Sequence, residues 1–484
     1  MPANPTPIQR FARLTVIVLI ALVAVAAVAP THANDRPNII FVFADDLGWG
    51  DLAVYGHDRI KSPNLDRMAR EGTLFTQFYV NPTCSPSRAA IMTGHFPNRH
   101  RVHGHFGKPE LNQRRAMPDF LDPEAPILPR ELQKAGYKTA HFGKWHLSTP
   151  AAVPPPPKPD AYGFDVYHMA RENNWPDTHA PEHTLWHWTN RHLSSERIID
   201  QTIAFIEQNK DDGPFFINAW LLDTHSLLRP TVEDREPYKH LNARAGKLDL
   251  VGATTVYYSV VTKMDRHVGR LLKRLDELGL SDNTLLIFSS DNGPEVFQVR
   301  NASHSAVGSA GPFRGRKRSL YEGGIRVPFI ARWPGTVPAG VVNNTSVMTG
   351  VDLLPTFIRL AGAELPTDYT PDGEDVSDIL RGSTRKRTAA LLYEQRVRTP
   401  GHVHHRSPAL AIRSGDWKLL MNPDGSRIEL YNIVDDPREL NNVAYKHPNT
   451  IDELRAPLMK FHADIPPGPF DADAGSDHYP WPGR

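Results

Sequence analysis

Cysteine is almost absent from this sequence, which contains one cysteine, Cys84, among 484 residues. A single cysteine excludes an internal disulfide framework. The residues that follow it, Ser85 and Pro86, predict a helix start with Ser85 as the N-cap and Pro86 in the first turn. We therefore expect Cys84 just before a helix N-terminus, where unpaired backbone N–H groups favour negative charge, and Arg88 about one turn along. Three interpretations stay open: a buried small hydrophobic residue, a nucleophilic thiolate, or a side chain that is converted into another group.

An excess of charge of either sign is also absent. The chain has 55 Lys and Arg against 54 Asp and Glu, so its formal net charge is +1. A near-neutral protein gives no electrostatic reason to expect nucleic-acid binding. The basic run at 314–318 is a candidate for such a patch, but no larger basic region accompanies it in the sequence. We therefore expect no nucleic-acid partner.

Long apolar runs are absent beyond the N-terminus. Residues 1–33 have the pattern of a secretory signal peptide: Arg10 and Arg13, an apolar run over 14–28, and small residues before position 34. An uncleaved membrane anchor is the competing interpretation, but the run is shorter than the roughly 20 residues that a spanning helix needs. Cleavage would remove two arginines and no acids, which moves the formal charge from +1 to −1. We expect an exported protein, periplasmic or secreted, or lysosomal only in a eukaryote, without stable membrane insertion.

Apolar runs of strand length alternate with helical patterns through the first three quarters of the chain. Such runs are typical of parallel strands buried on both faces, and they occupy 38–44, 137–142, 214–222, 284–290 and 327–331. Helical spacing covers 64–72, 127–135, 194–208, 256–278 and 352–361. The pattern predicts an α/β domain over 34–365, with a mostly parallel sheet flanked by helices. Short alternating runs and turns then predict a smaller C-terminal domain over 366–484, with an antiparallel sheet and a helix.

Polar clusters follow four of the predicted strands at the point where each strand ends. They are Asp45-Asp46, Lys144-Trp145-His146, Asp223-Thr224-His225 and Asp291-Asn292. One such cluster is weak evidence, because these residues are common in turns. Ligands of open parallel sheets, however, bind outside the carboxyl ends of the strands, so four clusters there predict one shared site.

The residue types in these clusters suit a hard metal ion and an anionic group. Asp45, Asp46, Asp291 and Asn292 offer only oxygen ligands, which favour calcium or magnesium over zinc. The cations Arg88, Lys144 and Lys317 fit a tetrahedral anion, since phosphoryl and sulfuryl transfers are stabilised by fixed cations with a metal ion. The remaining candidates, His146 and His225, can transfer protons near neutral pH.

A segment rich in Trp and His follows the proline-rich loop at 150–159. Its aromatic residues could stack on sugar rings at the edge of a cleft, or they could pack under a long loop, and both interpretations stay open. They are Trp175, His179, His183, Trp186, His187 and Trp188.

The motif around the cysteine resembles a known signature. Cys84-Ser85-Pro86-Ser87-Arg88 followed by Thr93-Gly94 is similar to the Cys-x-Pro-Ser-Arg pattern of the type I, formylglycine-dependent sulfatases of the alkaline-phosphatase-like superfamily. Four further motifs resemble that family in the same order: Asp45-Asp46, Gly143-Lys144-Trp145-His146, Asp291-Asn292-Gly293, and Arg314 to Lys317 with Glu322-Gly323-Gly324. Thr224 before His225 resembles members such as arylsulfatase A and N-acetylgalactosamine-6-sulfatase.

The resemblance implies a role for each motif. A formylglycine-generating enzyme would oxidise Cys84 to Cα-formylglycine, whose hydrate attacks sulfur with one hydroxyl and expels sulfate with the other. Arg88 and Lys144 would steady this residue, and Lys144 and Lys317 would bind the sulfate. His225 would protonate the leaving alcohol, His146 would accept the proton of the second hydroxyl, and one calcium ion would be held by Asp45, Asp46, Asp291, Asn292 and the modified Cys84.

Three functions therefore compete. The first is a calcium-dependent sulfatase that acts on a sulfated carbohydrate or a small aryl sulfate. The second is a phosphonate or phosphodiester hydrolase of the same superfamily, because the metal and the cations also suit a phosphoryl group. The third is a binder of sulfated glycans that has kept the site without catalysis, which predicts an unmodified thiol at Cys84.

Overall fold

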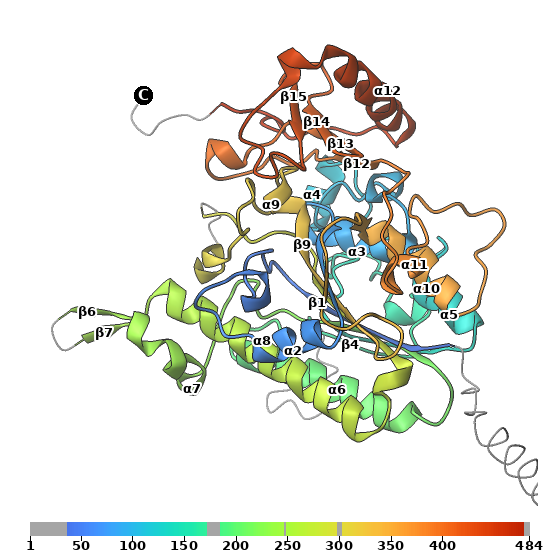
Figure 1. The fold of residues 1–484 in the computed structure, drawn as a ribbon, viewed down its shortest axis with the longest axis vertical. Helices are drawn as coiled ribbons and strands as arrows, with labels where there is room; N and C mark the ends of the chain where they lie inside the picture. The colour runs from blue at the N-terminus through green and yellow to red at the C-terminus, as the bar shows by residue number, and fades with distance from the viewer. Residues whose placement is uncertain (1–35, 172–183, 246–247, 298–302, 479–484) are drawn as a thin grey trace, which may run out of the picture. The chain divides into compact units, whose positions relative to one another are not determined.

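The computed structural model describes residues 36–171, 184–245, 248–297 and 303–478 (Figure 1). Residues 1–36 and 37–484 form separate units, and the fold below is that of the second unit. The predicted signal peptide lies outside the described residues. Within the part of the chain that the structure describes, no helix has both the length and the apolar character that crossing a membrane requires.

Helices and strands alternate along the chain until the C-terminal sheet begins. The helices are α2 (Pro63–Arg70), α3 (Cys84–Thr93), α4 (Pro109–Arg114), α5 (Leu128–Lys134), α6 (Ser194–Asn209), α7 (Val232–Arg235), α8 (Ala253–Glu277), α9 (Glu322–Ile325), α10 (Leu353–Leu360), α11 (Ser377–Leu380) and α12 (Pro448–Asp464). The strands of the central sheet are β1 (Asn38–Ala44), β2 (Thr73–Tyr79), β3 (Lys138–Gly143), β4 (Val166–Met169), β5 (Phe215–Trp220), β8 (Thr284–Ser290), β9 (Arg326–Arg332), β10 (Val341–Asn343) and β11 (Met348–Thr349). A separate hairpin contains β6 (Ala243–Ala245) and β7 (Leu248–Leu250).

The central sheet has the order β10-β2-β9-β8-β1-β5-β3-β4, and β11 also pairs with β2. From β8 to β4 all neighbours are parallel. Only β9 runs against its neighbours, since it is antiparallel to both β8 and β2. The mostly parallel sheet is thus confirmed, and β1 is fully buried as its unbroken apolar sequence predicts.

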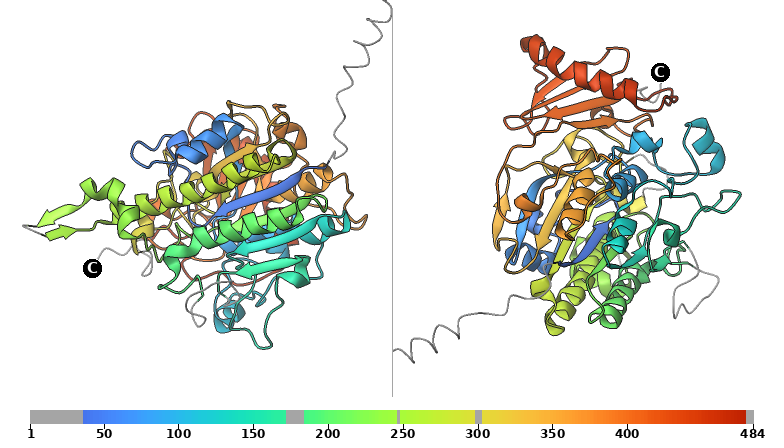
Figure 2. Two further views of the ribbon diagram at one scale, coloured as in Figure 1. Left: turned by 90° about the horizontal axis from the view of Figure 1, so that it is seen from below. Right: turned by 90° about the vertical axis from the view of Figure 1, so that its right-hand side faces the viewer.

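Helices cover both faces of this sheet (Figures 1 and 2). Alternate residues of β1 point to opposite faces: Phe41 packs in a core shared with α3, α5 and α10, whereas Val42 packs in a core shared with α2, α6 and α8. The long α8 presents its apolar side to the second core and ends before Gly279, whose φ of 67° lies in the left-handed region that glycine tolerates.

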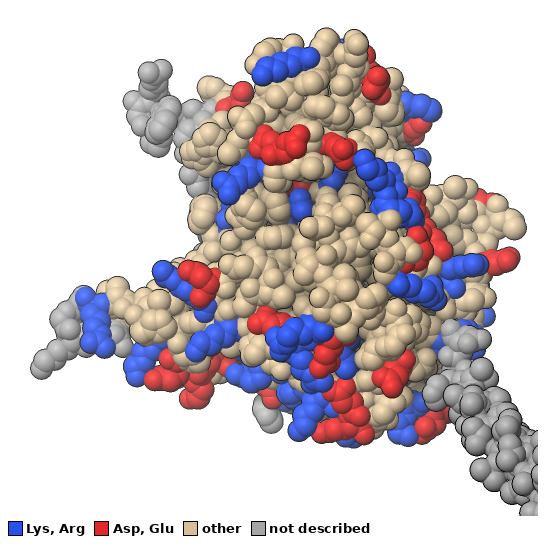
Figure 3. Space-filling view, in the orientation of Figure 1, with Lys and Arg blue, Asp and Glu red and all other residues tan. Residues whose placement is uncertain are grey.

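The C-terminal region forms the small antiparallel sheet that the sequence predicts. Its order is β12 (Leu391–Glu394), β13 (Leu410–Ser414), β14 (Trp417–Met421) and β15 (Glu429–Asn432). One face packs on α12 through Leu458, and the other packs near Tyr79 and Tyr321 of the larger region. The domain boundary near residue 365 stays a prediction. On the face drawn in Figure 3, basic and acidic side chains are interspersed.

Candidate functional site

The strands that carry the four polar clusters are neighbours in the sheet, in the order β8-β1-β5-β3. Their carboxyl ends therefore lie side by side, because these strands are all parallel. Asp45 and Asp46 follow β1, Asp291 and Asn292 follow β8, Lys144 follows β3, and His225 lies in the loop after β5. The structure thus brings together clusters that are up to 246 residues apart in the chain.

Cys84 is the first residue of α3, and Thr83 is the N-cap. The expected N-cap at Ser85 is therefore wrong by two residues, because the chain is still extended at Thr83 and turns helical at Cys84. Ser85 instead accepts a hydrogen bond at Oγ from the backbone N–H of Phe106, at 3.1 Å. Cys84 is buried, and burial raises the pKa of its thiol although Lys144 and Lys317 oppose that shift.

Arg88 lies one turn along α3 and is fully buried. Its guanidinium donates to Asp291 Oδ2 from Nη2 at 2.6 Å and from Nε at 3.2 Å, and to the carbonyl oxygen of Lys144 at 3.1 Å. One face of the guanidinium stacks on Trp220, with Cζ 4.7 Å from the ring centroid. Arg88 therefore joins the cysteine helix to the ends of β8 and β3.

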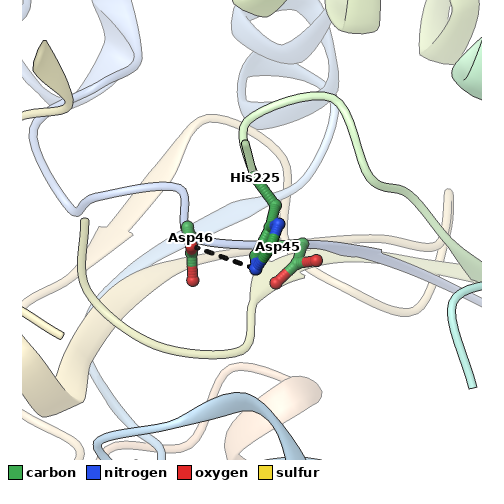
Figure 4. Close-up of side chains that lie close together, drawn as sticks. All are labelled: Asp45, Asp46 and His225. Atoms are coloured by element: carbon green, nitrogen blue, oxygen red, sulfur yellow. Dashed lines mark ion pairs between the residues drawn. The ribbon is translucent and has the colours of Figure 1, made fainter. Parts of the chain in front are cut away.

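Three of the candidate metal ligands each have a buried oxygen without a hydrogen-bond partner among the described residues: Asp45 Oδ1, Asp46 Oδ2 and Asn292 Oδ1. Single ligand atoms of Asp45, Cys84 and Asp291 lie within 4.8 Å of one another, as do those of Asp45, Asp46 and His225 (Figure 4). Unsatisfied buried oxygens are costly, and a hard cation would satisfy them. These residues therefore fit a metal ion.

Two lysines approach the same carboxylates. Lys144 Nζ is 2.5 Å from Asp45 Oδ2, and Lys317 Nζ forms an ion pair with Asp46 Oδ1. Burial alone would raise the pKa of Asp45, but attraction from His225, Lys144 and Arg88 outweighs it and holds the pKa well below its usual range. Burial and the neighbouring carboxylates raise the pKa of Asp46 to about 7, despite Lys317. An anion bound here would contact both lysines.

The two histidines each donate to a backbone carbonyl. His146 Nε2 is 3.1 Å from the Phe106 carbonyl oxygen, which can only accept, so Nε2 carries the proton and the buried Nδ1 is left as the acceptor. His225 Nδ1 is 2.8 Å from the Ser226 carbonyl oxygen, and Nε2 faces Asp46 Oδ2 at 3.8 Å. Burial lowers the pKa of both imidazoles well below the usual range, and at His225 the attraction of Asp45 opposes that shift.

Two charged residues at the site, Glu295 and Arg191, were not among those predicted from the sequence. Glu295 lies 2.5 Å from Arg318 Nη1 and 3.7 Å from Lys317 Nζ, and its position three residues after Asn292 could have indicated it. Arg191 is buried and donates to the carbonyl oxygens of Leu222 and His225 at 2.6 Å and of Leu227 at 3.1 Å. It thereby holds the loop that carries His225.

The Trp- and His-rich segment is only partly described. Trp175, His179 and His183 lie outside the described residues. Trp186 lies against the site, with its ring centroid 5.3 Å from that of His225, whereas Trp188 is 54% exposed. Among the described residues of this segment, Trp186 therefore lies where it could stack on a bound sugar, as the first interpretation expects.

Comparison with known proteins decides the family. A family model described as Sulfatase matches residues 37–363, more than half of the chain. The chain belongs to the sulfatase family. A second model, described as N-sulphoglucosamine sulphohydrolase, C-terminal, matches residues 311–463. Sulfatases are sulfuric ester hydrolases, and the resemblance inferred from the sequence motifs is confirmed.

The relatives include sulfatases of animals and bacteria. N-acetylgalactosamine-6-sulfatase of Canis lupus familiaris is 34% identical over 399 residues, which cover 76% of this chain and 69% of that protein. N-acetylgalactosamine-6-O-sulfatase of Bacteroides thetaiotaomicron is 28% identical and covers 87% of this chain and 92% of that one.

Solved structures share the fold over nearly the whole chain. The PsFucS1 sulfatase from Pseudoalteromonas sp. has a TM-score of 0.69 at 25% identity and covers 96% of this chain and 95% of its own. Ps i-CgsB in complex with k-i-k-neocarrahexaose has a TM-score of 0.72 at 26% identity, covering 91% of this chain and 96% of its own. A phosphonate monoester hydrolase of Agrobacterium radiobacter shares the fold at 20% identity, with a TM-score of 0.61 over 89% of this chain and 96% of its own.

Proposed function

We propose that this enzyme removes sulfate from a sulfated carbohydrate or an aryl sulfate, with a formylglycine hydrate made from Cys84 as the nucleophile and one bound calcium ion. The observation that carries the proposal is the position of Cys84, at a helix start, beside three unsatisfied buried oxygens and the cations Arg88, Lys144 and Lys317. A thiol with a raised pKa is a poor nucleophile, which favours conversion of the side chain over direct attack.

Asp45, Asp46, Asp291, Asn292 and the modified Cys84 would hold the calcium ion. When bound, calcium would draw charge from the sulfate oxygens and favour ionisation of the hydrate. The oxygen-only set of protein ligands supports a hard cation, and the paired lysines would turn from Asp45 and Asp46 toward the sulfate. Lys144 and Lys317 would then bind the sulfate oxygens.

Side chains of the site would also orient the formylglycine and transfer protons. Arg88 holds the end of α3 in place and, with Lys144, would steady the formylglycine. Asp291 could assist deprotonation of the attacking hydroxyl. His225 would give a proton to the leaving alcohol, and His146 would accept one at Nδ1 as sulfate departs, because its Nε2 is already committed to Phe106.

The names of two relatives, N-acetylgalactosamine-6-sulfatase and N-acetylgalactosamine-6-O-sulfatase, support a carbohydrate substrate. We further propose export by the signal peptide at residues 1–33, to the periplasm or the medium, and maturation of Cys84 by a formylglycine-generating enzyme. The proposed division into domains at 34–365 and 366–484 would place the whole site in the first domain.

The test compares wild-type protein with Cys84→Ala, produced in a host that contains the maturing enzyme. Wild-type protein should hydrolyse p-nitrophenyl sulfate, and peptide mass spectrometry should find formylglycine at position 84. Cys84→Ala should lose turnover while keeping the circular dichroism and melting temperature of the wild type.

Two outcomes would contradict this proposal. A clear preference for a phenyl phosphonate monoester over the sulfate would favour the phosphonate hydrolase, whose fold is shared. An intact thiol at Cys84 in protein from a competent host would favour a glycan binder without catalysis.

A further inference from the structure

One side of the site is formed by Trp186. The indole lies 5.3 Å from the imidazole of His225 between ring centroids, and Lys144 Nζ is 5.7 Å from the indole centroid. Because His225 is the proposed proton donor to the leaving alcohol, Trp186 lies on the side where the sugar of the substrate would sit.

Two arginines contact the same indole but differ in their partners. Arg191 is buried, 5.1 Å from the ring centroid, and satisfies three backbone carbonyls. Arg171 follows β4 and places its guanidinium carbon 4.1 Å from the ring centroid. Arg171 is exposed, and no described carboxylate forms an ion pair with it. It is therefore a guanidinium with its hydrogen-bond donors available.

Four carboxylates of the site each form an ion pair with a different cation: Asp45 with Lys144, Asp46 with Lys317, Asp291 with Arg88, and Glu295 with Arg318. The buried Arg191 is occupied by backbone carbonyls. Arg171 has no carboxylate partner among the described residues, and it lies within the electrostatic field of the site: desolvation lowers the pKa of its guanidinium, and the attraction of Cys84 and Asp45 offsets only part of that shift. A monosulfate ester has one negative charge, which Lys144 and Lys317 would take up.

We propose that Arg171, held against Trp186, forms a subsite for a second anionic group on the substrate, beside the sulfate that is removed. A guanidinium fork binds a carboxylate or a sulfate through two parallel hydrogen bonds, and stacking on an indole fixes the plane of the fork. The substrate class is then an acidic sugar, with either a uronate carboxylate or a second sulfate. This inference rests on the proposed function.

The experiment measures kcat and KM of wild type, Arg171→Gln and Arg171→Lys on three matched saccharides. One has a single sulfate, one has that sulfate and a uronate, and one has two sulfates. Arg171→Gln should lower kcat/KM by about 10- to 100-fold more on a doubly anionic substrate than on the monosulfate, mainly through KM, because a charged hydrogen-bond partner is lost. Arg171→Lys should recover part of the loss. The second and third substrates separate the carboxylate from the sulfate.

Arg229→Gln is the matched control. Arg229 also stacks on an indole, that of Trp188 at 4.2 Å, but Trp188 contacts His187 rather than His225. This variant should behave as wild type on all three saccharides.

Equal losses on all three saccharides, or none, would overturn the subsite. If the wild type hydrolyses no sulfate ester, the proposed function fails, and the subsite is then judged by binding. Isothermal titration of the disulfated saccharide into Cys84→Ala, with and without Arg171→Gln, should show at least a tenfold weaker affinity in the double variant. Unchanged affinity there would overturn the subsite independently of turnover.

Discussion

Lys418 should be among the residues on which the stability of this enzyme depends most. It lies on β14, and its Nζ is 2.9 Å from Glu322 Oε1 and 2.9 Å from Glu439 Oε1. All three side chains are buried, with at most 1% exposed. Glu322 begins α9, directly before β9 of the central sheet. The amine thus links the C-terminal sheet to the central one, and Lys418→Met would leave two carboxylates buried beside each other.

The expected loss is large. Removing one partner of a buried ion pair costs about 3–5 kcal/mol, because the remaining charge is left without compensation. Glu322 keeps Arg326 at 3.3 Å and the hydroxyl of Tyr79 at 2.6 Å, whereas Glu439 accepts from a backbone N–H only. Most of the penalty should therefore fall on Glu439. Against a typical total stability of about 5–15 kcal/mol, such a loss is severe.

The loss should depend on pH. Burial raises the pKa of Glu439 to about 7 in the folded protein, so its contribution to stability is greatest below its unfolded pKa and is lost as pH rises through about 7. Without Lys418, that pKa rises further. At pH 5.5 the buried Glu439 can take up a proton and become neutral. At pH 8 it stays charged in the folded protein, and the folded state bears that cost. Lys418→Met should therefore cost more at pH 8 than at pH 5.5.

The assay is urea unfolding followed by tryptophan fluorescence at both pH values. Lys418→Met with Glu439→Gln should regain more than half of the loss, because the carboxylate that bears most of the penalty is gone. Lys460→Met is the matched control: its surface pair with Asp464 is exposed, so it should cost less than about 0.5 kcal/mol. A loss under about 1 kcal/mol at pH 8, or an equal loss at both pH values, would refute the reasoning.

Three further outcomes concern the site. His225→Ala should slow alkyl sulfates at least tenfold more than aryl sulfates, since a poor leaving group needs its proton more; equal losses would exclude a proton donor there. Arg191→Met removes the donor to the carbonyls around His225, so it should also lower kcat more for alkyl sulfates than for aryl sulfates, and Arg191→Lys should restore part of the rate. A change in KM with unchanged kcat would contradict the positioning role. Calcium at a hundred times its dissociation constant should stabilise chelator-treated protein by about 2.7 kcal/mol, measured by melting temperature. Asn292→Ala should reduce this shift, and an unchanged shift would place calcium elsewhere.

Prediction from the sequence succeeded where local pattern decides structure. β8 begins and ends at the predicted residues, 284 and 290, because its seven residues are apolar or small and turn residues flank them on both sides. β2, Thr73–Tyr79, was missed, since its mixed sequence TLFTQFY gives neither a clean alternation nor a continuous apolar run. The antiparallel direction of β9 was missed for a related reason: an apolar strand buried on both faces looks the same in either direction.

The sequence by itself determined the long helices, the continuous apolar strands, the motifs and the chemistry of the side chains that follow four of those strands. These depend on periods of two and of 3.6 residues and on residue type, which are local properties. Only the tertiary structure decided which side chains meet: Arg88 with Asp291 across 203 residues, Glu295 with Lys317 and Arg318, and Trp186 with His225. Such contacts depend on strand order and on loop paths, which long-range packing selects and no local pattern encodes.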